Sequence, residues 1–196
     1  MKIIDNRIEK SQCIQEFEKL LDIYSSIKPK YVLEIGSLMG WSLHHWIYYA
    51  QEGATVISLD LPISQFCGPQ DPRCSEQEKA IKEEWPVWAK KNKTKLYLIK
   101  GASQQPASKE QLEKILGENK LDFIFIDGNH FYEYVKQDFE IFSIFMRKGG
   151  VVAFHDIAKN EEGTVDTYWE EIKKNYKYEE ITLHPNQEKG IGVLYI

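Results

Sequence analysis

Glycines and carboxylates follow an apolar run near the start of the chain, and together they can form one wall of a ligand site. The run YVLEI contains Glu34 and leads into Gly36 and Gly40. Glycine lets the backbone turn sharply and approach a ligand closely, and the N–H groups of a following helix favour an anionic group. Ser37 and Ser42 belong to the same stretch, and the Ser42 hydroxyl can add a contact. The carboxylate of Glu34 would hold an ammonium group, directly or through water.

A further acid, Asp60, ends the second apolar run, ATVISLD. An acid at that place binds ribose hydroxyls in nucleotide-binding sheets. With Glu34 and the glycine turn, Asp60 suits a ligand that carries a ribose, an amine and a carboxylate. The alternative is that Gly-x-x-x-Gly is an ordinary tight turn, but the acids before and after it favour a ligand site.

Two later apolar runs also end in carboxylates, Asp127 and Asp156, each with a histidine close by. Carboxylates that converge at one sheet edge can hold a divalent cation, and His155 could be a third ligand, although imidazole suits manganese, iron or zinc better than magnesium. His130 can take a hydroxyl proton as a general base. The alternatives are that Asp127 contacts only a cofactor and that both histidines have structural roles.

The elements that must position these residues alternate between strands and helices. Such alternation predicts an α/β fold, a Rossmann-like, doubly wound and mostly parallel sheet of seven strands. The gap between the last two strands is too short for a crossover helix, so they should form a C-terminal antiparallel hairpin. Ligands bind beyond the carboxyl ends of such strands. The expected strands are 31–35, 54–60, 95–101, 121–128, 149–156, 176–184 and 190–196, and the expected helices are 10–27, 42–51, 75–92, 108–117, 131–146 and 164–175.

Four segments, LEIGSLMGWS, ISLD, FIFIDGNH and GGVVAFHD, together resemble the class I S-adenosylmethionine-dependent methyltransferases. The resemblance runs from about Ile14 to Ile196 and is strongest to small O-methyltransferases related to macrocin O-methyltransferase and the cephalosporin hydroxylase-like proteins. It implies that Ala102 and Ser103 flank the adenine, where many relatives carry an acid in place of Ala102. The residues it places around the methionine end and the ribose of the cofactor are Glu34, Gly36, Ser37, Gly40, Ser42, Asp60 and Asp127.

The same resemblance implies roles for the later acids and histidines. Asp127 and Asp156 match positions that bind magnesium in metal-dependent relatives, and His155 stands where some relatives carry an acidic ligand. His130 matches the histidine that is the implied base in sugar O-methyltransferases. The expected activity is therefore O-methylation of a hydroxyl on a small molecule or sugar, with S-adenosylmethionine and with or without a divalent metal such as Mg or Mn.

The composition narrows the remaining function classes. A net charge of -5 without a basic stripe argues against nucleic-acid binding. No apolar stretch is long enough for a signal peptide or a bilayer span, and three cysteines do not form a disulfide framework, so we expect a cytoplasmic protein. We expect a single domain over 1–196, with an N-terminal helix within 1–30 and a lid or substrate loop at 61–74. The sequence leaves open whether the protein forms a homodimer.

Two other functions are compatible with parts of the pattern. A nicotinamide-dependent oxidoreductase also needs a glycine-rich first turn and an acid after the second strand, but its turn is Gly-x-Gly-x-x-Gly, and here only Gly36 and Gly40 are present. A non-catalytic protein with the methyltransferase fold is the second alternative. The intact set of acids at the strand ends argues against it.

Overall fold

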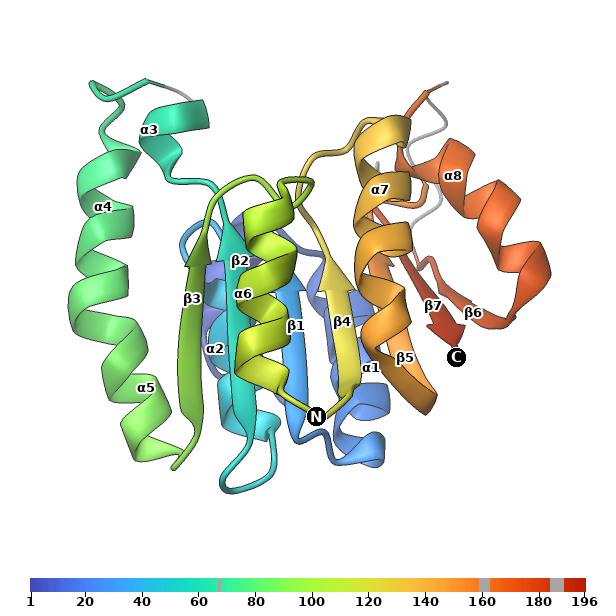
Figure 1. The fold of residues 1–196 in the computed structure, drawn as a ribbon, viewed down its shortest axis with the longest axis horizontal. Helices are drawn as coiled ribbons and strands as arrows, with labels where there is room; N and C mark the ends of the chain where they lie inside the picture. Colours follow the sequence, from blue (N-terminus) through green and yellow to red (C-terminus); the bar gives the residue numbers. More distant parts are fainter. Residues whose placement is uncertain (67, 159–162, 184–188) are drawn as a thin grey trace.

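A computed structural model describes residues 1–66, 68–158, 163–183 and 189–196. Seven strands form one sheet in the order β3-β2-β1-β4-β5-β7-β6 (Figure 1). The strands are β1 Tyr31–Ile35, β2 Thr55–Asp60, β3 Lys95–Lys100, β4 Leu121–Ile126, β5 Met146–His155, β6 Lys177–Ile181 and β7 Ile191–Tyr195.

The strand directions confirm the expected fold class. Strands β3, β2, β1, β4 and β5 pair in parallel, whereas β7 pairs antiparallel with both β5 and β6. The carboxyl ends of five strands therefore lie along one edge of the sheet, and the loops after them can form a shared site. The connection between β6 and β7 lies largely outside the described residues, at 184–188.

Helices cover both faces of the sheet, and each face has its own apolar cluster (Figure 1). One cluster contains side chains of α6 (Pro106–Leu116), α7 (Tyr132–Phe142) and α8 (Val165–Ile172). The other contains side chains of α1 (Ile14–Ile27), α2 (Trp41–Tyr49) and α5 (Trp85–Lys91). None of the helices in the described ranges is long and apolar enough to cross a membrane.

Successive residues of a strand point to opposite faces, and this alternation decides which side chains reach which helices. In β1, Leu33 and Ile35 pack in the cluster under α6 and α7, while Val32 packs in the cluster under α1 and α2. Glu34 shares the face of Val32 and contacts Trp46 of α2. A buried carboxylate thus lies under the helix that follows the glycine turn.

Three expected helices have different bounds from those that the apolar spacing indicates. The expected 10–27 helix begins only at Ile14, after the separate 3-10 helix η1, Asn6–Lys10. The expected 131–146 helix gives way to the 3-10 turn η3, Ser143–Phe145, and Met146 already belongs to β5. Met146 keeps the helical spacing after Phe142 and packs in the same apolar cluster, so tertiary packing rather than the apolar pattern decides where this helix ends.

The third expected helix, 75–92, begins as α4, Arg73–Lys79, and continues through the π-helical turn η2, Ala80–Glu84, into α5. Pro86 at the start of α5 has no N–H to donate to the preceding turn, and a wider turn accommodates this loss.

The expected lid, 61–74, contains the short helix α3, Ile63–Phe66, which lies beyond the carboxyl end of β2 (Figure 1). Buried Gln77 ties this segment to the glycine turn, because its Oε1 accepts from the Ile63 N–H at 3.0 Å and its Nε2 donates to the Leu38 carbonyl at 3.1 Å. Residue 67 lies outside the described residues. The role of the segment as a lid stays a prediction.

Candidate cofactor and catalytic site

The turn between β1 and α2 requires glycine at both residue 36 and residue 40. Gly36 has a φ of +85°, and a Cβ there would lie 2.2 Å from the Asp127 carbonyl oxygen. Gly40 has a φ of +78°, and a Cβ there would lie 2.4 Å from the indole ring of Trp85. Any side chain at either position would clash with a packed neighbour and would also be strained in the left-handed region. The turn is therefore fixed by backbone packing against β4 and α5.

Glu34 is fully buried, and its two carboxyl oxygens have different surroundings. Oε1 accepts from the Trp46 indole N–H at 2.7 Å, whereas no described residue donates to Oε2. Burial raises the pKa of Glu34 to about 7, although contacts with Ser37, Ser42 and Trp46 favour its charged form, and nearby Asp127 raises it further. An unpartnered buried acceptor of this kind suits a donor on a cationic ligand.

Asp60, at the end of β2, binds the backbone of the loop between β1 and α2. Its Oδ2 accepts from the Leu38 N–H at 2.6 Å, and burial raises its pKa to about 6 despite the backbone hydrogen bonds that it accepts. Ser37 is held to the same strand, because its hydroxyl lies 2.7 Å from that of Ser58. A cavity of about 110 Å³ opens beside Asp60, between β2, β3 and the α4–α5 run.

At the other end of the site, two aspartates and two histidines come together. Register explains part of this, because Phe125 pairs with Ala153 and Ile126 with Phe154, so Asp127 follows at the level of His155. The His155 Nδ1 lies 3.0 Å from Asp127 Oδ1 and 3.1 Å from Asp156 Oδ1. The His130 Nδ1 lies 3.0 Å from Asp156 Oδ2, and its Nε2 lies 3.6 Å from Asp127 Oδ1.

The charges in this Asp–His cluster (Asp127, His130, His155 and Asp156) balance one another. Burial alone would raise the pKa of Asp127, but the two imidazoles outweigh it and hold this pKa below its usual range. Burial would lower the pKa of His155, yet Asp127 and Asp156 outweigh it and raise this pKa. Asp127 and Asp156 therefore favour the charged form of the His155 ring that lies between them.

The backbone of this cluster is strained at Asp156. Asp156 has a φ of +63°, a conformation that few residues other than glycine, asparagine and aspartate adopt. Its side chain is only 8% exposed, compared with 37% for His130. Strain of this kind persists only where the surrounding structure fixes it, and it is concentrated at functional sites.

The predicted metal ligands converge, but their arrangement does not fit a metal ion. In the described ranges, no group of three or more His, Cys, Asp or Glu side chains is arranged to hold one. Asp127 and Asp156 instead both lie close to His155 Nδ1, at 3.0 and 3.1 Å, and they favour the charged form of its ring. A protonated ring nitrogen has no lone pair for a metal.

In the loop after β3, sequence reasoning named Ala102 and Ser103 as adenine contacts but missed an acid beside them. Asp138 of α7 is fully buried, and burial raises its pKa to about 7. Its Oδ1 accepts from the Gln104 side-chain N–H at 2.7 Å, and Gln104 also contacts the Ser103 hydroxyl at 2.7 Å. The only signal for Asp138 in the sequence is a charge among the apolar positions of a helix.

A second missed residue comes from the N-terminal segment. The Gln12 side-chain N–H donates to Asp127 Oδ2 at 2.9 Å, and Gln12 is only 3% exposed. The two residues are 115 positions apart in the sequence, so no local pattern could have paired them. Asp127 is thus contacted from the first turn before α1 as well as by the two histidines.

Comparisons with known proteins agree with this architecture. A family model for a methyltransferase domain matches residues 33–157, which include the glycine turn, Asp60, the IDGNH segment and Asp156. No curated protein matches the sequence.

Solved structures with the same fold include several methyltransferases. An O-methyltransferase from Bacillus cereus in complex with SAH has 16% identity and a TM-score of 0.66, with 95% of this chain and 83% of that chain covered. The O-methyltransferase TomG from Streptomyces achromogenes, in complex with SAM, has 14% identity and a TM-score of 0.61, with coverage of 95% and 81%. The SAH-bound methyltransferase PaMTH1 from Podospora anserina has 14% identity and a TM-score of 0.58, with coverage of 98% and 83%.

The family match spans more than half of the chain, and the sheet order and the terminal antiparallel strands agree with it. The chain therefore belongs to the methyltransferase domain family, as a class I S-adenosylmethionine-dependent methyltransferase.

Proposed function

We propose that this protein transfers a methyl group from S-adenosylmethionine to a hydroxyl group of a small molecule or sugar. The observation that carries the proposal is the contact of His130 Nδ1 with Asp156 at 3.0 Å, because it orients a partly exposed imidazole at the edge of the sheet where ligands bind. The O-methyltransferases from Bacillus cereus and Streptomyces achromogenes, which share the fold, support oxygen as the accepting atom.

The residues of the glycine turn fit the cofactor. Glu34 offers a buried acceptor without a described partner, which suits an ammonium group. The N–H groups at the start of α2 suit a carboxylate, with Ser42 beside them. Asp60 follows the second strand, where an acid can bind ribose hydroxyls, and Ser103 in the loop after the third strand is the proposed contact to the adenine. Bound S-adenosylmethionine supplies an electrophilic methyl group on its sulfonium sulfur.

His130 is the proposed general base. With its Nδ1 proton directed at Asp156, the lone pair of its Nε2 can take the proton of an acceptor hydroxyl. The hydroxyl oxygen then has the electron pair that attacks the methyl carbon. Asp127 Oδ1, at 3.6 Å from Nε2, stabilises the imidazolium that results. Asp156 acts as a positioning residue, because it fixes the tautomer and the direction of the ring.

The predicted divalent metal has no support from the donor arrangement, so no step of this mechanism depends on one. His155 instead lies between Asp127 and Asp156, with its Nδ1 3.0 and 3.1 Å from their carboxyl oxygens. A glycan acceptor, a homodimer and a cytoplasmic location are further parts of the proposal that rest on the sequence resemblance and composition alone.

The first test is calorimetric. Titration of S-adenosylhomocysteine into the purified protein should show binding at micromolar concentration, and no binding at millimolar concentration would refute the cofactor assignment. Titration of NAD and NADP in parallel separates the oxidoreductase alternative, which predicts the opposite preference.

The second test separates catalysis from binding. A panel of sugar and catechol acceptors should be screened by release of S-adenosylhomocysteine. His130→Ala should then lower kcat by about 100-fold or more and leave S-adenosylhomocysteine affinity within about 3-fold of wild type. A variant that binds the cofactor weakly and keeps its turnover would contradict the role of His130 as the base, and retained turnover with intact binding would exclude it.

A further inference from the structure

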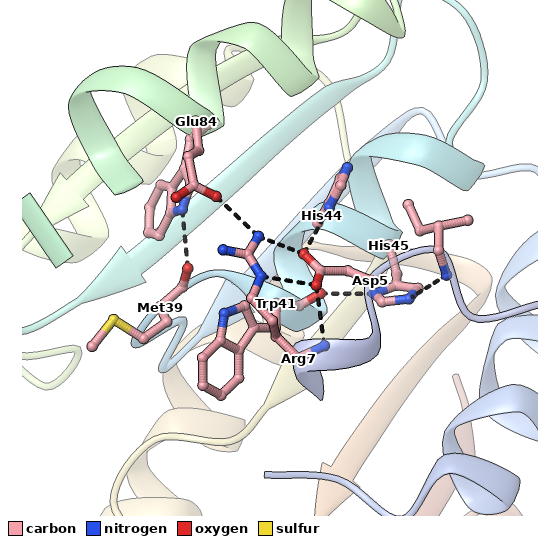
Figure 2. A network of polar contacts seen from close by, with 9 residues as sticks. Asp5, Arg7, Met39, Trp41, His44, His45 and Glu84 are labelled. Carbon is pink, nitrogen blue, oxygen red and sulfur yellow. Dashed lines mark hydrogen bonds and ion pairs between the residues drawn. The ribbon is translucent and has the colours of Figure 1, made fainter. Parts of the chain in front are cut away.

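The N-terminal segment before α1 is fixed across two helices by a polar network (Figure 2). Arg7 donates to both carboxyl oxygens of Asp5, at 2.9 and 2.7 Å, and to Glu84 of η2 at 2.9 Å. The His44 ring of α2 lies 3.1 Å from Asp5 and stacks on Trp88 of α5 with centroids 3.9 Å apart. The segment is therefore packed as an integral part of the domain, and these contacts fix the position of the residues between it and α1.

Gln12 lies at the end of this segment and enters the cofactor site. Its Nε2 donates to Asp127 Oδ2 at 2.9 Å, while its buried Oε1 has no donor among the described residues. The orientation of the amide is fixed by chemistry, because the ionised carboxylate of Asp127 can only accept and must face the –NH2 group. The carbonyl oxygen of Gln12 is thus presented beside Asp127 as an unsatisfied acceptor.

A second buried acceptor lies in the same region. The Oε2 of Glu34 also lacks a donor among the described residues, and Glu34 interacts electrostatically with Asp127. Gly36, two residues after Glu34, has its backbone against the carbonyl of Asp127. Gln12 thus contacts Asp127 directly and Glu34 interacts with it electrostatically, and each has one buried oxygen without a donor among the described residues.

We propose that Gln12 is a cofactor-binding residue, whose carbonyl oxygen accepts a hydrogen bond from the ammonium group of S-adenosylmethionine together with Glu34. The inference rests on the proposed function and adds a binding residue from outside the 33–157 region that the family model matches. Acceptors alone, next to carboxylates, select a group that has several N–H donors and a positive charge. A hydroxyl has one donor and a carboxylate has none, so neither would satisfy both oxygens.

The test compares two ligands that differ only in the amine. S-adenosylhomocysteine and its desamino analogue, in which hydrogen replaces the amino group, should be titrated by calorimetry into wild type, Gln12→Met and Gln15→Met. Gln15 is exposed and three residues away, so Gln15→Met is the matched control. Wild type and the control should bind S-adenosylhomocysteine about 30-fold or more tightly than the desamino analogue. Gln12→Met should reduce this ratio of affinities by about 10-fold.

Each other result has a defined meaning. If Gln12→Met weakens both ligands equally, or neither, Gln12 only supports Asp127 and the inference is wrong. If wild type binds both ligands equally, the inference fails while the proposed function stands. If wild type binds neither, the proposed function fails first. Should Gln12→Met not fold, Gln12→Asn keeps the amide but withdraws it by one methylene, and the same loss of preference is expected.

Discussion

Nδ1 of His130 lies 3.0 Å from Oδ2 of Asp156, a residue held with a φ of +63°. The two residues come from different strand ends, β4 and β5, and a strained backbone aims the second at the first. A carboxylate in this place favours the tautomer with the proton on Nδ1, so that Nε2 is the ring nitrogen that can accept a proton.

Asp156→Asn tests this relationship without disturbing the backbone, because asparagine also tolerates the left-handed region. We expect kcat to fall by about 10- to 100-fold, because an amide in place of the carboxylate no longer fixes the tautomer of His130, while S-adenosylhomocysteine affinity changes less than about 3-fold. The comparison of kcat with cofactor affinity is the decisive measurement. Full turnover in the variant would show that Asp156 does not act through His130.

Glu34→Gln should separate stability from binding. The pKa of Glu34 is raised to about 7 in the folded state from 4.5, so the folded state binds the proton more tightly, and stability is lost as pH rises from about 4.5 to 7. Glutamine keeps the acceptor for Trp46 and removes this loss. Above pH 7 the variant should be more stable by about 2–3 kcal/mol in chemical denaturation, and near pH 4.5 the two proteins should be equal.

The same variant should bind S-adenosylhomocysteine about 10-fold more weakly at pH 8, because it lacks the charge that pairs with the ammonium group. Calorimetry of both proteins at pH 8 measures this loss. Equal affinity would show that Glu34 is not a partner of the amine, and no gain in stability at high pH would show that burial does not raise the pKa of Glu34.

Gly36→Ala and Gly53→Ala form a matched pair for the glycine turn. Both glycines have positive φ, +85° and +81°, but a Cβ at residue 36 would lie 2.2 Å from the Asp127 carbonyl, and a Cβ at residue 53 meets nothing within 4 Å. Gly53→Ala should cost about 1 kcal/mol of unfolding free energy, and Gly36→Ala should cost at least about 3 kcal/mol or prevent folding. Similar losses in urea unfolding would mean that the close approach of β1 and β4 is not a constraint.

Removal of metal ions addresses the predicted cation directly. Because the His155 ring lies against both Asp127 and Asp156 and takes up their nearest oxygens, we expect turnover after dialysis against EDTA to stay within about 2-fold of the untreated enzyme. Addition of Mg²⁺ or Mn²⁺ should then change it little. A loss that either ion restores would establish metal dependence and would require His155 to release its proton and its carboxylate contacts.

Much of the fold could be predicted from local patterns. The five parallel strands, the terminal antiparallel pair and the glycine turn follow from runs of apolar residues, their spacing and two glycines, because backbone geometry limits each pattern to one element type. Helix ends were less predictable. Met146 begins a strand and Pro86 follows a π-helical turn, since packing and a missing N–H decide those boundaries.

The sequence by itself determined that Glu34, Asp60, Asp127 and Asp156 lie along one edge of a sheet, because parallel strands bring their carboxyl ends together. Only the tertiary structure decided what those acids contact. Gln12 reaches Asp127 across 115 residues, Asp138 of α7 reaches Gln104 in the loop before α6, and His155 takes the place between two carboxylates that a cation was expected to hold. Local propensity sets the position of a residue on its element, whereas a side-chain contact between distant elements depends on how those elements pack.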